Sequence, residues 1–335
     1  MTVGESRERV ESETDSDDQE LETTPTPSDA FGALGGETRM TVVQALADDE
    51  PRTFSELHDA TDADTSAGFA YHLRQLTDQF VRQRADERYE LTDAGRAVAR
   101  AVRAGTYTAS VDREPVALDE DCPFCGDAAL RATVADNVTE IGCDTCDRPV
   151  LRMSFPPSGY ADRDADAVPE ALDAHHRRRI GSFADGVCPE CAGPVATTVE
   201  AVGAGDARDG SDGTERGDAP EPVQLAFACE TCGADLKCPA ALAVLDHPAV
   251  AAFYHDHDRD VRDRPIWNVG AEWRERVVSR DPWCVLVSVR LDDEDLLLYV
   301  AGDGSVVDHR RVPVDDPGTE RTAEESGSDA ESASA

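Results

Sequence analysis

The sequence predicts a multidomain α+β protein, and three observations lead to this fold class. Apolar residues recur at helical spacing over residues 28–105, and a short hairpin-like segment precedes the last helical stretch. Four Cys-x-x-Cys pairs follow over residues 122–232, and apolar strand-like segments joined by Asp- and Gly-containing turns fill residues 285–312. The length of 335 residues exceeds what one hydrophobic core usually holds, so several domains are expected.

The charge balance is typical of a protein from a salt-loving organism. The sequence holds 70 acidic and 32 basic residues, for a formal net charge of −38, and Lys237 is its only lysine. Carboxylates keep such a surface hydrated, while dissolved salt screens their mutual repulsion. Acidic chain ends alone do not explain the imbalance, because most of the excess charge lies between residues 30 and 314.

Both chain ends and one internal segment have the composition of disordered chain. Residues 1–27 and 315–335 are acidic and without periodicity, and residues 203–222 are rich in Gly and Asp. We therefore expect two disordered acidic tails and a flexible insert. The sequence contains neither a long apolar run nor a secretory leader, so we expect a cytoplasmic protein without membrane contact.

Residues 28–110 are expected to form one small domain. Ser28 or Asp29 can cap its first helix, and Thr53 followed by Glu56 forms a capping-box pattern. This order of elements is that of a winged helix-turn-helix domain. The expected helices cover residues 28–34, 37–47, 54–60, 65–79 and 93–105, and a hairpin over residues 80–91 precedes the last of them.

Two segments of this domain resemble ArsR-type transcription regulators of the haloarchaeal kind. Residues 31–46 read FGALGGETRMTVVQAL and are similar to the opening of these proteins. Residues 71–96 read YHLRQLTDQFVRQRADERYELTDAGR and are similar to their recognition helix, wing and final helix. The resemblance implies double-stranded DNA as a partner and a homodimer supported by residues 93–105. It does not imply metal sensing by the recognition helix, because residues 54–80 contain no cysteine.

The candidate DNA contacts lie on the expected recognition helix and wing. A helix fits into the major groove, where its polar side chains read base edges, and a wing reaches the backbone or the minor groove. Residues 65–104 hold seven arginines and five acidic residues, which makes this strip positive, as phosphate contact requires. Winged helices also mediate protein contacts, which is the alternative. The candidates are Thr65, Ser66, Tyr71, His72, Arg74 and Gln75 on the helix, and Arg82, Arg84 and Arg88 on the hairpin.

The Cys-x-x-Cys pairs predict two structural Zn²⁺ sites. Each pair presents two thiolates from one tight turn, and two turns complete a tetrahedral site. Gly126 and Gly233 directly follow two of the pairs and can relieve strain there. Redox chemistry needs only one pair, and four thiolates leave no open position for catalysis. The first set is Cys122, Cys125, Cys143 and Cys146, and the second is Cys188, Cys191, Cys229 and Cys232.

These sets predict two zinc-ribbon-like modules and a further element behind them. The modules cover residues 116–160 and 170–245, and the insert at 203–222 enlarges the second. Without that insert the two spacings approach each other, which indicates a duplicated unit. Residues 246–314 are expected to form a small α+β element with one helix and three strands.

Several polar residues stay outside these sites. The run His175, His176 and Arg177–Arg179 is interpreted as a helix face paired with acidic groups of the surface, with nucleic-acid contact as the alternative. His255 and His257 point apart on a helix and are expected to be solvated. Cys238 and Cys284 are expected to be buried thiols. The alternative for Cys238 is that it serves as a spare metal ligand.

The favoured hypothesis is a site-specific transcription regulator that is not an enzyme. A winged helix followed by a zinc ribbon also resembles archaeal transcription initiation factor E, so a protein-interaction factor of the transcription machinery is the second hypothesis. A third, an enzyme that uses the metal sites, lacks support, because the sequence contains no phosphate-binding glycine loop, nucleophile elbow or nucleophile–base motif.

Overall fold

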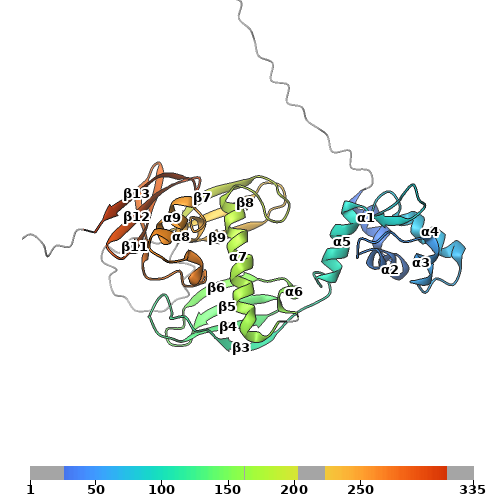
Figure 1. Ribbon diagram of the computed structural model, residues 1–335, viewed down its shortest axis with the longest axis horizontal. Helices are drawn as coiled ribbons and strands as arrows, with labels where there is room; N and C mark the ends of the chain where they lie inside the picture. Colours follow the sequence, from blue (N-terminus) through green and yellow to red (C-terminus); the bar gives the residue numbers. More distant parts are fainter. Residues whose placement is uncertain (1–25, 162, 203–222, 315–335) are drawn as a thin grey trace, which may run out of the picture. The chain divides into compact units, whose positions relative to one another are not determined.

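The computed structural model describes residues 26–161, 163–202 and 223–314 (Figure 1). The chain divides into two compact units, one ending at Thr108 and the other beginning at Ala109. Both contain helices and antiparallel strands, so the fold is mixed α+β, as predicted. The expected tails, apart from Thr26 and Pro27, and the expected insert at 203–222 lie outside the described residues. In the part of the chain that is described, no helix combines the length and the apolar character needed to cross a membrane.

The first unit consists of helices and one short hairpin. Thr26, not Ser28 or Asp29, caps the first helix, and Asp29 completes the capping box at its third position. The predicted capping box of Thr53 and Glu56 is present. The elements are α1 (Pro27–Leu34), α2 (Glu37–Ala45), α3 (Phe54–Asp59), α4 (Ser66–Leu76), β1 (Val81–Gln83), β2 (Tyr89–Leu91) and α5 (Asp93–Arg103).

The core of this unit lies between the helices and under the hairpin. Val42 of α2, Leu57 of α3 and Phe69 of α4 are fully buried in one hydrophobic cluster. The hairpin follows α4 after a tight turn and places Val81 opposite Leu91 in the same cluster. Gly95 permits close packing of α5, because a Cβ atom there would lie 2.0 Å from the Phe80 carbonyl oxygen.

The second unit contains two sheets that carry the cysteine pairs at equivalent places. In each, the first pair precedes a strand hairpin and the second pair lies in the turn after that hairpin. This shared layout agrees with the predicted duplication. The first sheet has the order β3 (Arg113–Ala117), β4 (Leu130–Ala135), β5 (Val138–Cys143) and β6 (Pro149–Ser154), and the second has the order β7 (Val195–Ala201), β8 (Val223–Cys229) and β9 (Asp235–Cys238).

The third sheet is a four-stranded antiparallel meander. Its last three strands were expected from their apolar segments and the turns between them, whereas β10 was missed because arginines, Glu275 and Ser279 interrupt its apolar residues. Glu275 also faces inward in this strand. The strands of this sheet are β10 (Trp273–Arg280), β11 (Trp283–Leu291), β12 (Glu294–Ala301) and β13 (Val306–Pro313).

The described helical segments of this unit are α6 (Pro157–Tyr160), η1 (Ala165–Ala167), α7 (Val168–Ala184), α8 (Ala240–Ala243), α9 (Pro248–Asp256) and η2 (Val261–Asp263).

Helix α7 joins the three sheets into one core. Figure 1 shows it running from the sheet of β3–β6 to that of β7–β9. His175 near its middle packs edge-on against Phe155, and Phe183 at its end lies 6.0 Å from Phe227 of β8. Apolar residues of all three sheets belong to a single buried cluster with α7. The two predicted modules therefore correspond to two separate sheets, but these sheets share one hydrophobic core.

Candidate metal centres and candidate nucleic-acid interface

Each predicted set of four cysteines comes together in the structure. The Sγ atoms of Cys122 and Cys146 are 3.8 Å apart, and those of Cys125 and Cys143 are 3.7 Å apart. In the second set, Cys188 Sγ lies 3.6 Å from Cys232 Sγ, and Cys191 Sγ lies 3.5 Å from Cys229 Sγ. Within each set all four sulfur atoms lie within 4.8 Å of one another. The first pair thus faces the second pair across a small gap in both sheets.

The sulfur spacing fits a tetrahedral metal ion. An ion about 2.3 Å from each of four thiolates, as zinc is, requires sulfur atoms about 3.8 Å apart. Two separations in each set, of 3.5–3.8 Å, agree with this requirement, and the others stay within 4.8 Å. Each set is therefore a complete donor set for a metal ion such as zinc.

Backbone amides stabilise the thiolate form of one cysteine in each set. The N–H groups of Cys146 and Thr145 donate to the Cys143 sulfur and lower the pKa of its thiol to about 7, although burial acts against them. Those of Cys232 and Thr231 donate to the Cys229 sulfur, each at 3.4 Å, and lower the pKa of that thiol to about 6. Because metals bind thiolates, Cys143 and Cys229 are the best prepared ligands of their sets, whereas neighbouring thiols and burial raise the pKa of Cys125 and Cys191 to about 12.

All four cysteine turns have the same backbone. In each, the residue after the second cysteine donates its N–H to the carbonyl of the first cysteine. That residue is left-handed, with φ of 78° at Gly126 and 74° at Gly233, the two glycines expected to relieve strain. Asp147 and Ala192 adopt φ of 55° and 60° at the equivalent places. Such angles cost a non-glycine residue energy, so the turn geometry is imposed there by the surrounding structure.

The two remaining cysteines lie apart from the metal sets. Cys238 is buried near Glu275, and burial, aided by the Glu275 carboxylate, raises the pKa of its thiol to about 12. The prediction of a buried thiol is confirmed for Cys238, whereas Cys284 is only half-buried. The structure describes all ten cysteines of the chain, and none of them forms a disulfide.

Helix α4 presents a polar face to solvent. Ser66, Tyr71, Arg74 and Gln75 are exposed, and Tyr71 is 53% accessible despite its aromatic ring. Arg74 and Gln75 lie three and four residues after Tyr71, which places the three side chains on one side of the helix. The structure therefore gathers Tyr71, Arg74 and Gln75 into one accessible surface, and Ser66 is exposed in the first turn of the helix.

Two other candidates on this helix have structural tasks. The Thr65 hydroxyl accepts the N–H of Gly68 at 3.1 Å and caps the helix. His72 is half-buried, and its Nδ1 lies 3.1 Å from Nη1 of Arg39. The same guanidinium donates to carbonyl oxygens at the end of α1, including that of Ala33 at 2.6 Å. Arg39 thus ties α1 to α4, a role that its sequence context did not indicate.

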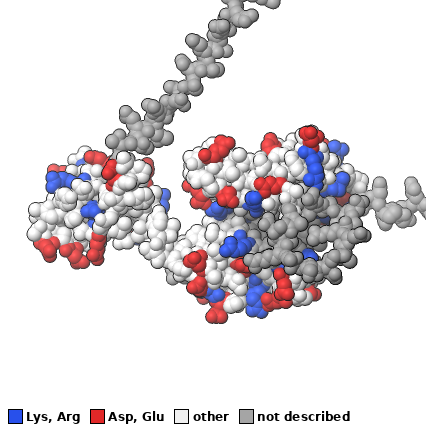
Figure 2. Space-filling model, turned by 180° about the vertical axis from the view of Figure 1, so that it is seen from behind, with Lys and Arg blue, Asp and Glu red and all other residues white. Residues whose placement is uncertain are grey.

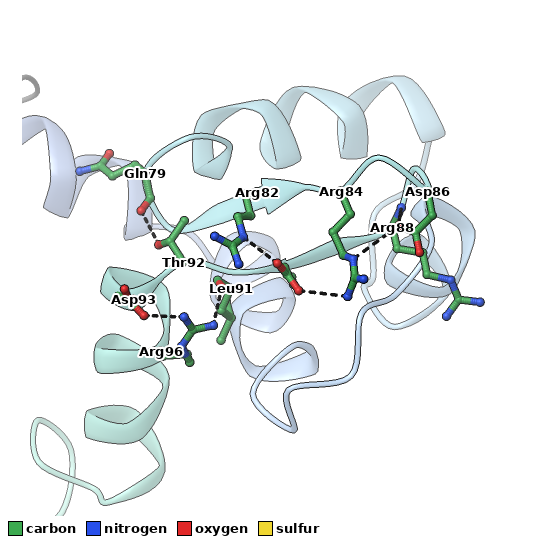
Figure 3. A network of polar contacts seen from close by, with 10 residues as sticks. Gln79, Arg82, Arg84, Asp86, Arg88, Leu91, Thr92, Asp93 and Arg96 are labelled. Carbon is green, nitrogen blue, oxygen red and sulfur yellow. Dashed lines mark hydrogen bonds and ion pairs between the residues drawn. The ribbon is translucent and has the colours of Figure 1, made fainter.

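Two hairpin arginines, Arg82 and Arg84, share the Glu90 carboxylate as a partner (Figure 3). Arg82 Nε donates to Glu90 Oε1 at 2.6 Å, and Arg84 Nη1 lies 3.4 Å from the other oxygen of that carboxylate. Arg84 also lies 3.6 Å from Asp86, and Arg88 donates to the Pro51 carbonyl at 3.1 Å. Arg82 and Arg84 stay 59% and 46% exposed. Glu90 was not singled out in the sequence, yet it sets the positions of both arginines.

The interpretation of the histidine–arginine run as a surface face is wrong for two of its residues. His176 is 1% exposed and Arg177 is 6% exposed. Arg177 pairs with Asp173 on the next turn and donates to the Arg264 carbonyl at 2.9 Å. Within this run only Arg178 is exposed, while Arg179 is half-buried and pairs with Glu190. Most of the run is turned inward because α7 shares one hydrophobic core with the sheets of this unit.

The expectation of a solvated His257 is also wrong. Its Nδ1 lies 2.9 Å from Asp292 and its Nε2 lies 3.3 Å from Glu294. Its side chain is 13% exposed, whereas His255 is exposed, as expected. The carboxylates come from the turn between β11 and β12 and from β12 itself, a long-range placement that the local sequence does not encode.

Comparisons with known proteins divide the chain at the same place as the structure. The family described as Domain of unknown function (DUF7351) matches residues 119–306, more than half of the chain and entirely within the second unit. The family described as Domain of unknown function (DUF7347) matches residues 27–102, within the first unit. Comparison with curated proteins gave no match, and comparison with solved structures gave none either.

Proposed function

Because the chain belongs to the DUF7351 family, whose description assigns no activity, we propose its function from its own residues. The protein is a DNA-binding transcription regulator of the ArsR-like winged-helix type. Its first unit binds double-stranded DNA, and its second unit is held together by two structural zinc ions.

The exposed polar face of α4, followed directly by an arginine-bearing hairpin, supports this proposal best. Tyr71, Arg74 and Gln75 offer hydrogen-bond donors, acceptors and an aromatic surface to base edges. Arg82 and Arg84 leave about half of their side-chain surface open to solvent. In the proposed complex α4 enters the major groove and the hairpin contacts the phosphate backbone.

The pairing with Glu90 determines how the hairpin meets phosphate. Arg82 and Arg84 each use part of their donor set on this carboxylate and keep other N–H groups free. A phosphate therefore competes with an internal anion, which weakens sequence-independent attraction. High salt weakens it further, because release of counterions then gains little. Base-edge and apolar contacts from α4 must supply a larger share of the affinity.

The zinc ions act as structural ties in this proposal. Four thiolates fill a tetrahedral ion's coordination sphere, so no position stays open for a reacting water. Each ion would join the segment before a strand hairpin to the turn after that hairpin, and both sheets share the core of the second unit. The thiols must stay reduced to bind, which suits a cytoplasmic protein. The dimer is proposed from the resemblance to ArsR-type proteins, with α5 as its support.

Selection of bound fragments from random duplex DNA, followed by fluorescence anisotropy at fixed salt, tests the proposal. We expect a discrete motif and nanomolar to micromolar binding of it. Arg84→Met should weaken binding to all sequences alike, whereas Gln75→Ala should reduce discrimination between the motif and its point variants. Arg131→Met, in the second unit, changes the net charge equally and should leave binding unchanged.

A failure to select any motif would overturn the proposal. Pull-down from extract of the native host then separates the two remaining classes. Specific recovery of RNA polymerase would favour the transcription-machinery factor. A cobalt-substituted protein whose spectrum shows anything other than all-sulfur tetrahedral sites would contradict the structural role of the metal.

A further inference from the structure

A large cavity lies in the second unit where the three sheets meet. Its volume is about 1280 Å³, more than drug-sized ligands usually require. Residues of β6, β9, β10 and α7 line it, together with the segment that contains the first cysteine pair. The cavity adjoins the first metal set, because Cys122 is one of its lining residues, whereas no cysteine of the second set lines it.

Aromatic and apolar side chains form part of the wall. Trp267 and Trp273 both line the cavity, and each is fixed by a hydrogen bond from its indole nitrogen. Trp267 Nε1 donates to Glu120 at 3.1 Å, and Trp273 Nε1 donates to the Tyr254 hydroxyl at 2.8 Å. Fixed indole rings provide a preformed surface against which a planar apolar group can pack.

His176 is a deeply buried polar group in this wall. It is 1% exposed, and neither of its ring nitrogens makes a hydrogen bond of good geometry within the described residues, although the Ser154 backbone lies near enough to favour its protonated form. Burial lowers the pKa of His176 to about 3, and the nearby His175 and Arg179 lower it further. The imidazole is therefore neutral and offers one N–H donor and one acceptor. Buried polar atoms without partners are rare and call for a ligand or a water.

Arg179 stands one helical turn beyond His176 on α7 and also lines the cavity. Its guanidinium pairs with Glu190 through Nη1, while its Nε has no partner within the described part of the chain. Residues three apart on a helix share a face, so both side chains line the cavity from the same side of α7. An anionic oxygen is the group that accepts from both.

The wall is also less acidic than the rest of the protein. Five basic and four acidic described residues line the cavity, whereas the whole chain has 32 basic and 70 acidic residues. Figure 2 shows Lys and Arg side chains gathered around the middle of this unit. In so acidic a chain, a nearly balanced wall makes this cavity a favourable place for an anion.

We propose that this cavity binds a small organic anion with a planar apolar body. The anionic group accepts hydrogen bonds from His176 and from Arg179 Nε, and the planar body packs against Trp267 and Trp273. The site does not depend on DNA binding, since its residues all belong to the second unit.

The test uses 8-anilinonaphthalene-1-sulfonate, an aromatic sulfonate, with the full metal-loaded chain and no DNA. We expect saturable binding of one dye per chain, accompanied by energy transfer from the tryptophans. N-phenyl-1-naphthylamine, which lacks the sulfonate, should bind at least about tenfold more weakly, because a charge-assisted hydrogen bond is lost.

Variants on α7 locate the site. Arg179→Met and His176→Phe should each weaken dye binding about tenfold. Arg178→Met removes the same charge one residue away, where the side chain is exposed, and should leave binding unchanged. The dye affinity of each variant is compared at equal metal content and only where thermal unfolding shows an intact transition. If His176→Phe does not fold, the dye affinity of Arg179→Met alone tests the site.

Three results would each overturn the proposal. These are no saturable binding of the sulfonate, equal binding of the uncharged dye, or equal loss of affinity in Arg178→Met and Arg179→Met. Retained DNA binding under any of these results would leave the proposed function intact, so the two proposals fail separately.

Discussion

Replacement of His176 by phenylalanine is expected to make the second unit less sensitive to acid. The folded His176 has a pKa of about 3, against 6.5 for an unhindered histidine, because it is buried next to His175 and Arg179. Between these values the unfolded chain binds a proton that the folded chain does not. Stability from this group is therefore fully present above pH 6.5 and is lost as the pH falls toward 3.

The magnitude follows from the two pKa values. Between pH 8 and pH 5.5, protonation of the unfolded state lowers the free energy of unfolding by about 1.4 kcal/mol. His176→Phe removes this contribution. It also removes two buried ring nitrogens without partners, which should make the variant about 1 kcal/mol more stable than wild type at pH 8.

Urea unfolding of the metal-loaded protein at pH 8 and pH 5.5, in the same salt, measures the effect. The wild type and the variant share all other titrating groups. The difference between the free energies of unfolding that they lose from pH 8 to pH 5.5 therefore isolates the contribution of His176. A variant that loses as much stability as the wild type would refute the reasoning. So would a variant that is less stable at pH 8, since His176 would then have a partner in the folded protein.

Three further perturbations test other parts of the molecule. Cys143→Ser should lower the bound metal from two equivalents to one, whereas Cys238→Ser should retain both; metal analysis of purified protein decides, and two equivalents in the first variant would contradict the site. Phe69→Ala should destabilise the first unit by about 3–5 kcal/mol in thermal unfolding, because this fully buried ring packs edge-on against Phe54, and a loss below about 1 kcal/mol would contradict that packing. Glu90→Gln should raise DNA affinity at fixed salt by releasing two hairpin arginines, and a fall in affinity would instead show that Glu90 must position them.

Local signals predicted the parts of the fold that depend on neighbouring residues. The capping box at Thr53 and Glu56 marked the start of α3, and the cysteine spacing identified both metal sets. Gly126 and Gly233 were expected in strained turns because glycine alone adopts positive φ without cost. Asp147 and Ala192 take the same conformation, and no local rule predicts it, since the tertiary structure imposes it.

Long-range placement explains what the sequence did not reveal. His176 and Arg177 lie in a run of five basic and aromatic side chains that is polar by any local measure. They are buried because α7 shares one hydrophobic core with sheets from distant parts of the chain. Glu90 was missed for a different reason, because its pairing with two arginines depends on the register Arg82 to Glu90 across the hairpin. The periodicity of one element does not reveal which residues of another element it meets.

The shared core connects metal binding with the proposed ligand site. One metal set lies at the end of each of two sheets, and the third sheet supplies Trp273 to the cavity wall between them. A ligand changes an equilibrium only if it binds one state better than another. The cavity wall is built from four separate elements, β6, β9, β10 and α7. A small shift of one sheet relative to the others therefore changes the shape of the cavity while the internal structure of each sheet stays the same. An anion seated on α7 would therefore favour the arrangement in which all three sheets are docked, and loss of either metal ion would weaken anion binding without removing any residue that contacts the anion.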